Sequence, residues 1–356
     1  MNSSASASAD KAYDEERLAW GGSVTKKYLQ LPRLRRVSIY LLLADVFIVA
    51  FLVHAFEPLI TLLVRNEELF GSRLVLPLNE TLHPKPPAAL NKIPRILHQT
   101  SATEIIPDKW IHLQKSCKET YSEFEYKHWT DELARDFIAA EYPWFVDTWD
   151  NYAFPIQRAD AIRYFVLHEY GGIYLDMDTL CNETIPFHLL ESDGEAHHAV
   201  FKSTTPTGVS NDLMISSPRH PAFKTALDNL LFYNEITRFW APLLPHAAIM
   251  VGSGPFFLTM SVKNYLLQRP APPASSVQVV NATELAPYIT DLEDSSWHHG
   301  DTSTLMFVGD RPWIWFGLGA LGLGIGLHII NQGLLLACKG LGKLPSVTSI
   351  KVAKLI

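Results

Sequence analysis

The sequence predicts an α/β domain with a mainly parallel sheet, carried between two hydrophobic segments. Short apolar runs typical of strands alternate with helical patterns from residue 93 onward, and such alternation favours a parallel sheet. The 356 residues leave room for one sizeable domain with extensions. The formal net charge of −7 excludes a broad electrostatic attraction to nucleic acid.

The secondary structure is predicted from apolar periodicity and from residues that begin or end helices. Strands are predicted at residues 95–99, 124–129 and 173–175. Helices are predicted at residues 107–120, 131–141 and 155–170. Thr130 or Asp131 caps the second helix, and Gly171 with Gly172 ends the third.

Two hydrophobic segments are long enough to cross a membrane. Residues 37–64 are interrupted by Asp45 and Glu57, so a long buried helix is the alternative. Residues 312–338 begin with tryptophans suited to a membrane interface. Their closely spaced glycines either allow helix packing with a membrane partner or reflect the abundance of glycine in membrane helices. The other expected parts are a disordered tail (1–36), a proline-rich stalk (65–92), a globular domain (93–311) and a basic tail (339–356).

Basic residues flank both hydrophobic segments and set the expected orientation. They are Lys26, Lys27, Arg33, Arg35 and Arg36 before the first, and Lys339, Lys343, Lys351 and Lys354 after the second. Positive flanks favour the cytosol, so the middle of the chain is expected in the lumen of the secretory pathway. Three glycosylation sequons lie in that middle region, at Asn79, Asn182 and Asn281.

The three cysteines are too few for a disulfide-dense scaffold. Cys117 and Cys181 both fall in the expected luminal region, where an oxidising environment permits a disulfide. Two free buried thiols are the alternative, and the sequence does not decide between them.

The strongest chemical signal is a pair of carboxylates at the end of a short apolar strand. Asp176 and Asp178 follow the predicted strand at 173–175, and residues two apart in an extended chain point the same way. Converging carboxylates are costly unless a cation lies between them, and oxygen-only ligation favours Mg²⁺ or Mn²⁺. A solvated acidic loop is the alternative.

The helix before this strand carries a second charged pair. Asp160 and Arg163 are three residues apart, so they share one helix face. The helix leads directly into the Asp-x-Asp loop, and the pair is therefore expected to reach the same cleft and bind hydroxyl groups of a sugar. A simple surface ion pair is the alternative.

These residues resemble the motifs of glycosyltransferase family 32. The pattern Arg-x-Asp-x-x-Arg begins at Arg158, and Gly-Gly-x-Tyr-x-Asp-x-Asp begins at Gly171. Further similar segments are residues 94–99, 211–221, 252–255 and 295–301, so the resemblance covers residues 93–310. It implies a GT-A fold, a nucleotide-sugar donor, Mn²⁺ with Mg²⁺ as a substitute, and retention of anomeric configuration.

The resemblance also implies roles for individual residues. It assigns metal and diphosphate binding to Asp176 and Asp178, and donor-sugar contacts to Asp160 and Arg163. Donor contacts are further implied for His98, Gln99, Tyr174 and Trp297, and His298 is implied as a metal ligand, with His299 as the alternative.

Within this family, the chain resembles the fungal sphingolipid mannosyltransferases. This similarity implies GDP-mannose as donor, inositol phosphoceramide as lipid acceptor, a regulatory membrane subunit, and a Golgi membrane location with a luminal catalytic domain. Two alternatives remain. One is a Golgi mannosyltransferase acting on protein-linked glycans. The other is a haloacid-dehalogenase-type phosphatase. Residues 176–180 match the Asp-x-Asp-x-Thr signature of such phosphatases only in part, because Leu180 stands where threonine is expected.

Overall fold

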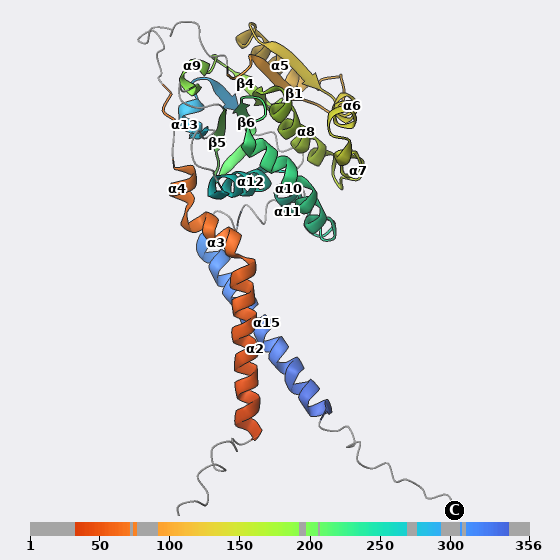
Figure 1. The fold of residues 1–356 in the computed structure, drawn as a ribbon, viewed down its shortest axis with the longest axis vertical. Helices are drawn as coiled ribbons and strands as arrows, with labels where there is room; N and C mark the ends of the chain where they lie inside the picture. Colours follow the sequence, from red (N-terminus) through yellow and green to blue (C-terminus); the bar gives the residue numbers. More distant parts are fainter. Residues whose placement is uncertain are drawn as a thin grey trace, which may run out of the picture. The chain divides into compact units, whose positions relative to one another are not determined.

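The computed structural model describes residues 33–71, 74–76, 92–191, 197–205, 207–268, 276–292, 307 and 311–341. These residues form two compact units, which Figure 1 colours along the chain. The smaller unit combines residues up to Phe56 with residues from Phe316, and the larger unit is Glu57–Trp315. The larger unit therefore begins well before residue 93, the domain boundary expected from the sequence.

The smaller unit contains two long hydrophobic helices, α2 (Arg33–Ala55) and most of α15 (Pro312–Leu341). Within α15, Gly317–Leu336 is long and apolar enough to cross a membrane. Ile39–Ala55 of α2 meets the same criterion only when joined to the next helix beyond Phe56. Length and composition thus support one spanning helix, or two if the interrupted pair counts as one span.

Two short helices, α3 (Glu57–Val64) and α4 (Asn66–Phe70), open the larger unit. Both contribute to its core, because Leu62 is fully buried and Phe70 is nearly so. The end of the first hydrophobic segment and the start of the expected stalk are therefore packed into the globular unit.

The other elements alternate along the chain. The strands are β1 (Ile96–Thr100), β2 (Glu125–Trp129), β3 (Gly172–Leu175), β4 (Thr179–Cys181), β5 (His198–Ser203), β6 (Val209–Ser216), β7 (Ser276–Val280) and β8 (Ile289–Asp291). The helices are α5 (Asp108–Thr120), α6 (Asp131–Glu141), the 3-10 helix η2 (Pro143–Phe145), α7 (Val146–Asp150), α8 (Pro155–Tyr170), α9 (Phe187–Leu190), α10 (Pro221–Arg238), α11 (Pro245–Gly252), α12 (Pro255–Gln268) and α13 (Ala282–Leu285). Every strand and helix predicted above is present, and the Thr130 side chain caps α6.

Six strands form one mixed sheet in the order β2-β1-β3-β6-β5-β7. β1 is parallel to β2 and β3, and β5 is parallel to β7, whereas β6 is antiparallel to both of its neighbours. The expected parallel arrangement is therefore correct only in part. β6 follows β5 after a short connection, and a short connection can join only antiparallel strands. β4 and β8 pair separately as a two-stranded antiparallel sheet.

Apolar cores cover both faces of the large sheet. In β3, Tyr174 points into one core, while Ile173 and Leu175 point into the other, as strand alternation requires. The first core includes residues of α6, α8, α10 and α12, and the second includes residues of α5, α9, α13 and β4. Figure 1 shows α5 and α12 on different sides of the sheet.

A double-glycine turn fixes how α8 leads into β3. Gly171 and Gly172 have positive φ angles of 66° and 97°, which glycine adopts without strain. A Cβ atom on Gly172 would also collide with the carbonyl oxygen of Ile96 in β1. Glycine here therefore lets β3 pack closely beside β1 and directs the strand that carries the acidic motif.

A disulfide joins Cys117 of α5 to Cys181 of β4. Two hydrogen bonds reinforce this contact. The Cys181 amide donates to the Ser116 hydroxyl, and the Thr120 hydroxyl donates to the Cys181 carbonyl, both at 3.2 Å. Because β4 begins directly after Asp178, α5 anchors the strand that leaves the acidic motif.

Candidate active site

The acidic motif lies where buried β3 ends and a tight turn begins. The amide of Asp176 donates to the carbonyl of Asp212 in β6 at 3.0 Å. The amide of Thr179 then donates back to the Asp176 carbonyl at 3.2 Å, which closes the turn that carries Asp178. The main chain of Asp176 is thus held by a neighbouring strand, and the turn after it is closed by its own hydrogen bond.

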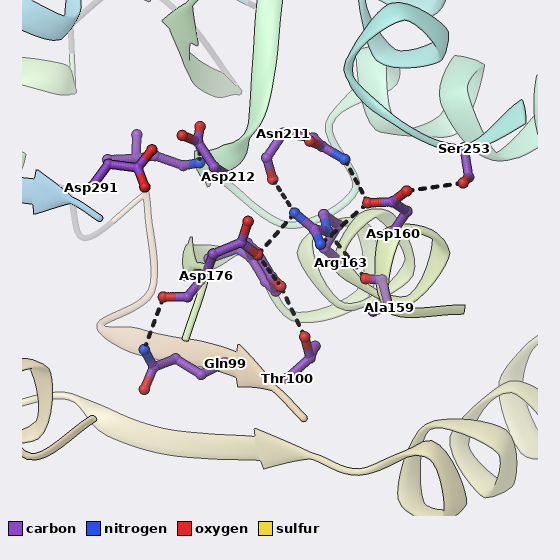
Figure 2. Close-up of polar contacts among 12 residues, drawn as sticks. Gln99, Thr100, Ala159, Asp160, Arg163, Asp176, Asn211, Asp212, Ser253 and Asp291 are labelled. Carbon is purple, nitrogen blue, oxygen red and sulfur yellow. Dashed lines mark hydrogen bonds and ion pairs between the residues drawn. The ribbon is translucent and has the colours of Figure 1, made fainter. Parts of the chain in front are cut away.

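Arg163 links the charged pair on α8 to the acidic motif, so the pair lies beside the motif and is not a surface ion pair. Its Nη1 lies 3.0 Å from Oδ1 of Asp176, and its Nη2 lies 3.2 Å from Oδ1 of Asp160. The same guanidinium donates to two main-chain carbonyls, those of Asn211 (2.7 Å) and Ala159 (3.1 Å). Figure 2 shows Arg163 at the centre of this network. A buried guanidinium held by four groups has a fixed orientation.

Both carboxylate oxygens of Asp160 accept further hydrogen bonds, one of them on the oxygen that also faces Arg163. Asn211 donates from Nδ2 to Oδ1 of Asp160 at 2.9 Å, and Ser253 donates from its hydroxyl to Oδ2 at 3.0 Å. Asn211 also donates to the hydroxyl of Tyr164 at 3.1 Å. Asn211 and Ser253 were not among the predicted site residues, although both lie in segments that resembled the family. The Asp160 side chain is only 7% exposed, so its geometry favours holding Arg163 over broad contact with a ligand.

Tyr174 and Gln99 complete the surroundings of Asp176. The Tyr174 hydroxyl donates to Oδ1 of Asp176 at 2.8 Å and lies 3.0 Å from the Thr100 hydroxyl. Gln99 donates from Nε2 to the Asp176 carbonyl at 3.4 Å, and Tyr126 donates to Oε1 of Gln99 at 3.2 Å. The structure therefore brings together five predicted residues, namely Gln99, Asp160, Arg163, Tyr174 and Asp176, and Asp178 follows in the same turn.

The charge of the motif suits a divalent cation. Burial raises the pKa of Asp176 to about 7, although Arg163 lowers it, and the charges of Asp178 and Asp212 raise it further. Arg163 and Tyr174 both contact Oδ1 of Asp176, and the Asp176 side chain is 29% exposed. Its other oxygen, Oδ2, is therefore the one able to face a cation. Hard oxygen donors of this kind fit Mn²⁺ or Mg²⁺. Within the described ranges, no set of three or more His, Cys, Asp or Glu residues is arranged to hold a metal.

Other predicted residues lie apart from this cluster or outside the described ranges. His98 is fully buried, and its ring contacts the Gly171 carbonyl through Nε2 (2.9 Å) and accepts from Trp129 Nε1 at Nδ1 (3.1 Å). Both ring nitrogens are thus used within the protein, and burial lowers the pKa of His98 to about 4. Trp297, His298 and His299 lie outside the described residues.

Comparisons with known proteins match this region to a family. Residues 107–196, which include Asp160, Arg163 and both motif aspartates, match the family described as glycosyltransferase sugar-binding region containing DXD motif. Among solved structures, PaToxG Glycosyltransferase is 17% identical, covers 48% of this chain and 69% of its own, and has a TM-score of 0.35.

Three curated fungal proteins are similar over much of the chain. The mannosyl phosphorylinositol ceramide synthase SUR1 of Saccharomyces cerevisiae is 39% identical over 232 residues, 64% of this chain and 58% of the relative. The synthase CSH1 of the same yeast is 35% identical over 272 residues, 74% and 69% of the two chains. Inositol phosphoceramide mannosyltransferase 2 of Schizosaccharomyces pombe is 38% identical over 223 residues, 61% of each chain. The matches thus span 58% to 69% of these relatives' lengths. The motifs, their geometry and this similarity together establish that the chain belongs to glycosyltransferase family 32, the DXD-containing sugar transferases.

Proposed function

We propose that this chain is a retaining, metal-dependent mannosyltransferase that moves mannose from GDP-mannose to inositol phosphoceramide. The names of its relatives support the sugar and the acceptor, because they describe mannosyl transfer to a phosphoinositol ceramide. The observation that carries the proposal is the anchored Asp-x-Asp motif, in which Arg163 and Tyr174 hold one oxygen of Asp176. Membership in a sugar-transferase family also rules out the phosphatase alternative.

Each site residue has a proposed task. Asp176 and Asp178 would hold Mn²⁺, with Mg²⁺ as a substitute, and the bound metal would stabilise the diphosphate leaving group. Arg163 orients Asp176, and Asp160 holds Arg163 while offering the donor sugar what little surface it exposes. Gln99 lies beside the Asp176 carbonyl and is proposed to approach the nucleotide.

Three further roles are proposals, the first two of them from family resemblance. Trp297 is proposed to close over the diphosphate, and His298 is proposed to complete the metal ligands. His98 is proposed to support the nucleotide site indirectly, through the β1 strand that it helps to fix between Gly171 and Trp129.

We further propose that the chain is a Golgi membrane protein with a luminal catalytic unit and a regulatory membrane subunit. The apolar helix Gly317–Leu336, the basic flanks and the Cys117–Cys181 disulfide, which needs an oxidising compartment, support this proposal. Protease treatment of sealed microsomes should remove tags placed at both ends while the catalytic unit stays intact. A protected tag after α15 would contradict the proposed crossing.

The catalytic proposal is tested with purified full-length protein in detergent. The protein is incubated with Mn²⁺, a panel of nucleotide sugars, and either inositol phosphoceramide or a soluble mannoside, and products are identified by mass spectrometry. Among the nucleotide sugars tested, we expect only GDP-mannose to give a mannosylated lipid. Asp178→Asn should fold normally and reduce transfer by about 100-fold or more, because a carboxylate ligand is lost.

The matched control is Asp136→Asn, which changes an exposed carboxylate on α6 and should leave transfer unchanged. Transfer to the soluble mannoside without any lipid product would favour the glycan-modifying alternative. Full activity of Asp178→Asn, or of the wild type in excess chelator, would refute the metal-dependent mechanism.

A further inference from the structure

Lys202 forms a charged bridge close to the acidic motif. Its ammonium group pairs with Oδ2 of Asp212 in β6 and, at 2.8 Å, with Oδ2 of Asp291 in β8. The Lys202 side chain is 14% exposed, and no more than a quarter of either partner's side chain is exposed. Figure 2 shows Asp212 and Asp291 on one side of Asp176, away from Arg163. The bridge therefore joins the large sheet to the small β4–β8 sheet.

The two partners of Lys202 are each connected to one motif aspartate through the main chain. The Asp212 carbonyl accepts the hydrogen bond from the amide of Asp176. Leu292, the residue after Asp291, donates its amide to the Asp178 carbonyl at 3.3 Å. One lysine thus bridges Asp212, whose carbonyl contacts Asp176, and Asp291, whose neighbour in sequence contacts Asp178.

The β4–β8 pair needs such an anchor. Each strand has three residues, paired from Thr179 with Asp291 to Cys181 with Ile289, and an isolated two-stranded ribbon is marginally stable in water. The disulfide at Cys181 fixes its far end. Near Asp178, the Lys202 bridge ties β8 to the large sheet.

The charges explain why one cation is required at this point. One ammonium group lies between the two carboxylates, and each carboxylate side chain exposes no more than a quarter of its surface to water. Without the lysine, Asp212 and Asp291 would be close like charges with little access to water, and they would repel each other. Repulsion would separate β6 from β8 and would move the two backbones that adjoin the motif.

We propose that Lys202 is a positioning residue of the active site, which fixes the backbones of Asp176 and Asp178 relative to each other by bridging Asp212 and Asp291, so that both side chains could hold the proposed metal. The part of this inference that concerns metal rests on the proposed function. The part that concerns the backbone does not, and the two are tested separately.

The first test measures amide hydrogen exchange in the full-length, metal-free protein. Lys202→Met should accelerate exchange by about 10-fold or more in peptides covering 174–181 and 287–292, with little change in α8 or α10. Lys202→Arg should restore most of the protection, because it keeps the bridging charge. The control is Lys224→Met, which removes an exposed lysine paired with Asp228 on α10 and should leave both peptides unchanged.

The second test measures the Mn²⁺ concentration that gives half-maximal transfer. Lys202→Met should raise it by about 10- to 100-fold, the range found when residues that orient metal ligands are lost, with a smaller change in kcat. Should Lys202→Met fail to fold, Asp291→Asn removes one arm of the bridge at nearly constant shape and should shift the same two readouts less.

The outcomes separate the two ideas. Wild-type protein without transferase activity would refute the proposed function but leave the exchange test intact. Faster exchange spread equally over the whole larger unit would show that Lys202 is only a stabilising ion pair. Unchanged exchange at 174–181 and 287–292 in both Lys202→Met and Asp291→Asn would overturn the proposal.

Discussion

Removing the disulfide between Cys117 and Cys181 should cost much of the stability of the larger unit while leaving its active site in place. The bond closes a loop across 64 residues of sequence. In the chain-entropy treatment, cross-linking over that separation restricts the unfolded chain by about 4 kcal/mol at 25 °C, a model-dependent magnitude. For a unit of this size, that loss corresponds to a fall in Tm of about 10 °C.

The active site should survive because other contacts hold β4 to α5. Ser116 and Thr120 each hydrogen-bond to the main chain of Cys181 and do not depend on the sulfur atoms. The alanine variant Cys117→Ala with Cys181→Ala should therefore retain its Mn²⁺ dependence at low temperature, even though it unfolds earlier on heating.

The assay compares thermal unfolding of full-length protein in detergent, followed by tryptophan fluorescence, with and without reductant. The control is Cys338→Ala, which removes the cysteine of α15 and should not change Tm. Two results would refute the reasoning: a Tm that neither the double substitution nor reductant lowers, or rapid alkylation of Cys117 and Cys181 in the native protein.

Two further predictions concern polar side chains outside the acidic motif. Burial lowers the pKa of His98 from an ordinary value of 6.5 to about 4, so the folded protein keeps this histidine neutral. Its contribution to the free energy of unfolding is therefore full above pH 6.5. Below that pH the unfolded chain binds a proton that the folded protein does not, and about 3 kcal/mol is lost as the pH drops toward 4. Tm of His98→Gln should decline less steeply over that range than Tm of wild type or of the exposed control His112→Gln, and parallel curves would contradict this. In the smaller unit, Asn331 of α15 donates from Nδ2 to Oδ2 of Asp45 in α2 at 3.1 Å. A double-mutant cycle that places leucine at both positions should give a coupling free energy of about 1 kcal/mol between them. Additive effects of the two substitutions on stability would exclude the contact.

Much of the local structure could be predicted because local residues determine it. Helix α8 begins at Pro155, which suits a first helical turn, and ends at Gly171, whose positive φ angle stops it. The spacing of Asp160 and Arg163 placed them on one face of that helix. In the structure Arg163 contacts both Asp160 and Asp176. Sequence reasoning succeeded where one helix, one turn and one strand follow each other without interruption.

The rest depends on contacts between distant parts of the chain. The antiparallel strand β6 brings Asn211 and Asp212 beside the motif, and no local pattern fixes which strand becomes the neighbour of β3. Likewise, Lys202 meets Asp291 across 89 residues of sequence. For His98 and Gln99 the signal was available, because adjacent residues in a strand point to opposite faces. Only one of the two could therefore line the site directly, and the structure brings Gln99 to Asp176.

The charges around the motif give a physical reason for the proposed metal dependence that is independent of family resemblance. The charged groups are the carboxylates of Asp160, Asp176, Asp178, Asp212 and Asp291 and the cations of Arg163 and Lys202. When all are ionised, three negative charges remain, in surroundings where burial already raises the pKa of Asp176. A nucleoside diphosphate would meet strong repulsion in such a site unless a divalent cation came with it. Donor binding itself, and not only transfer, should therefore require the metal.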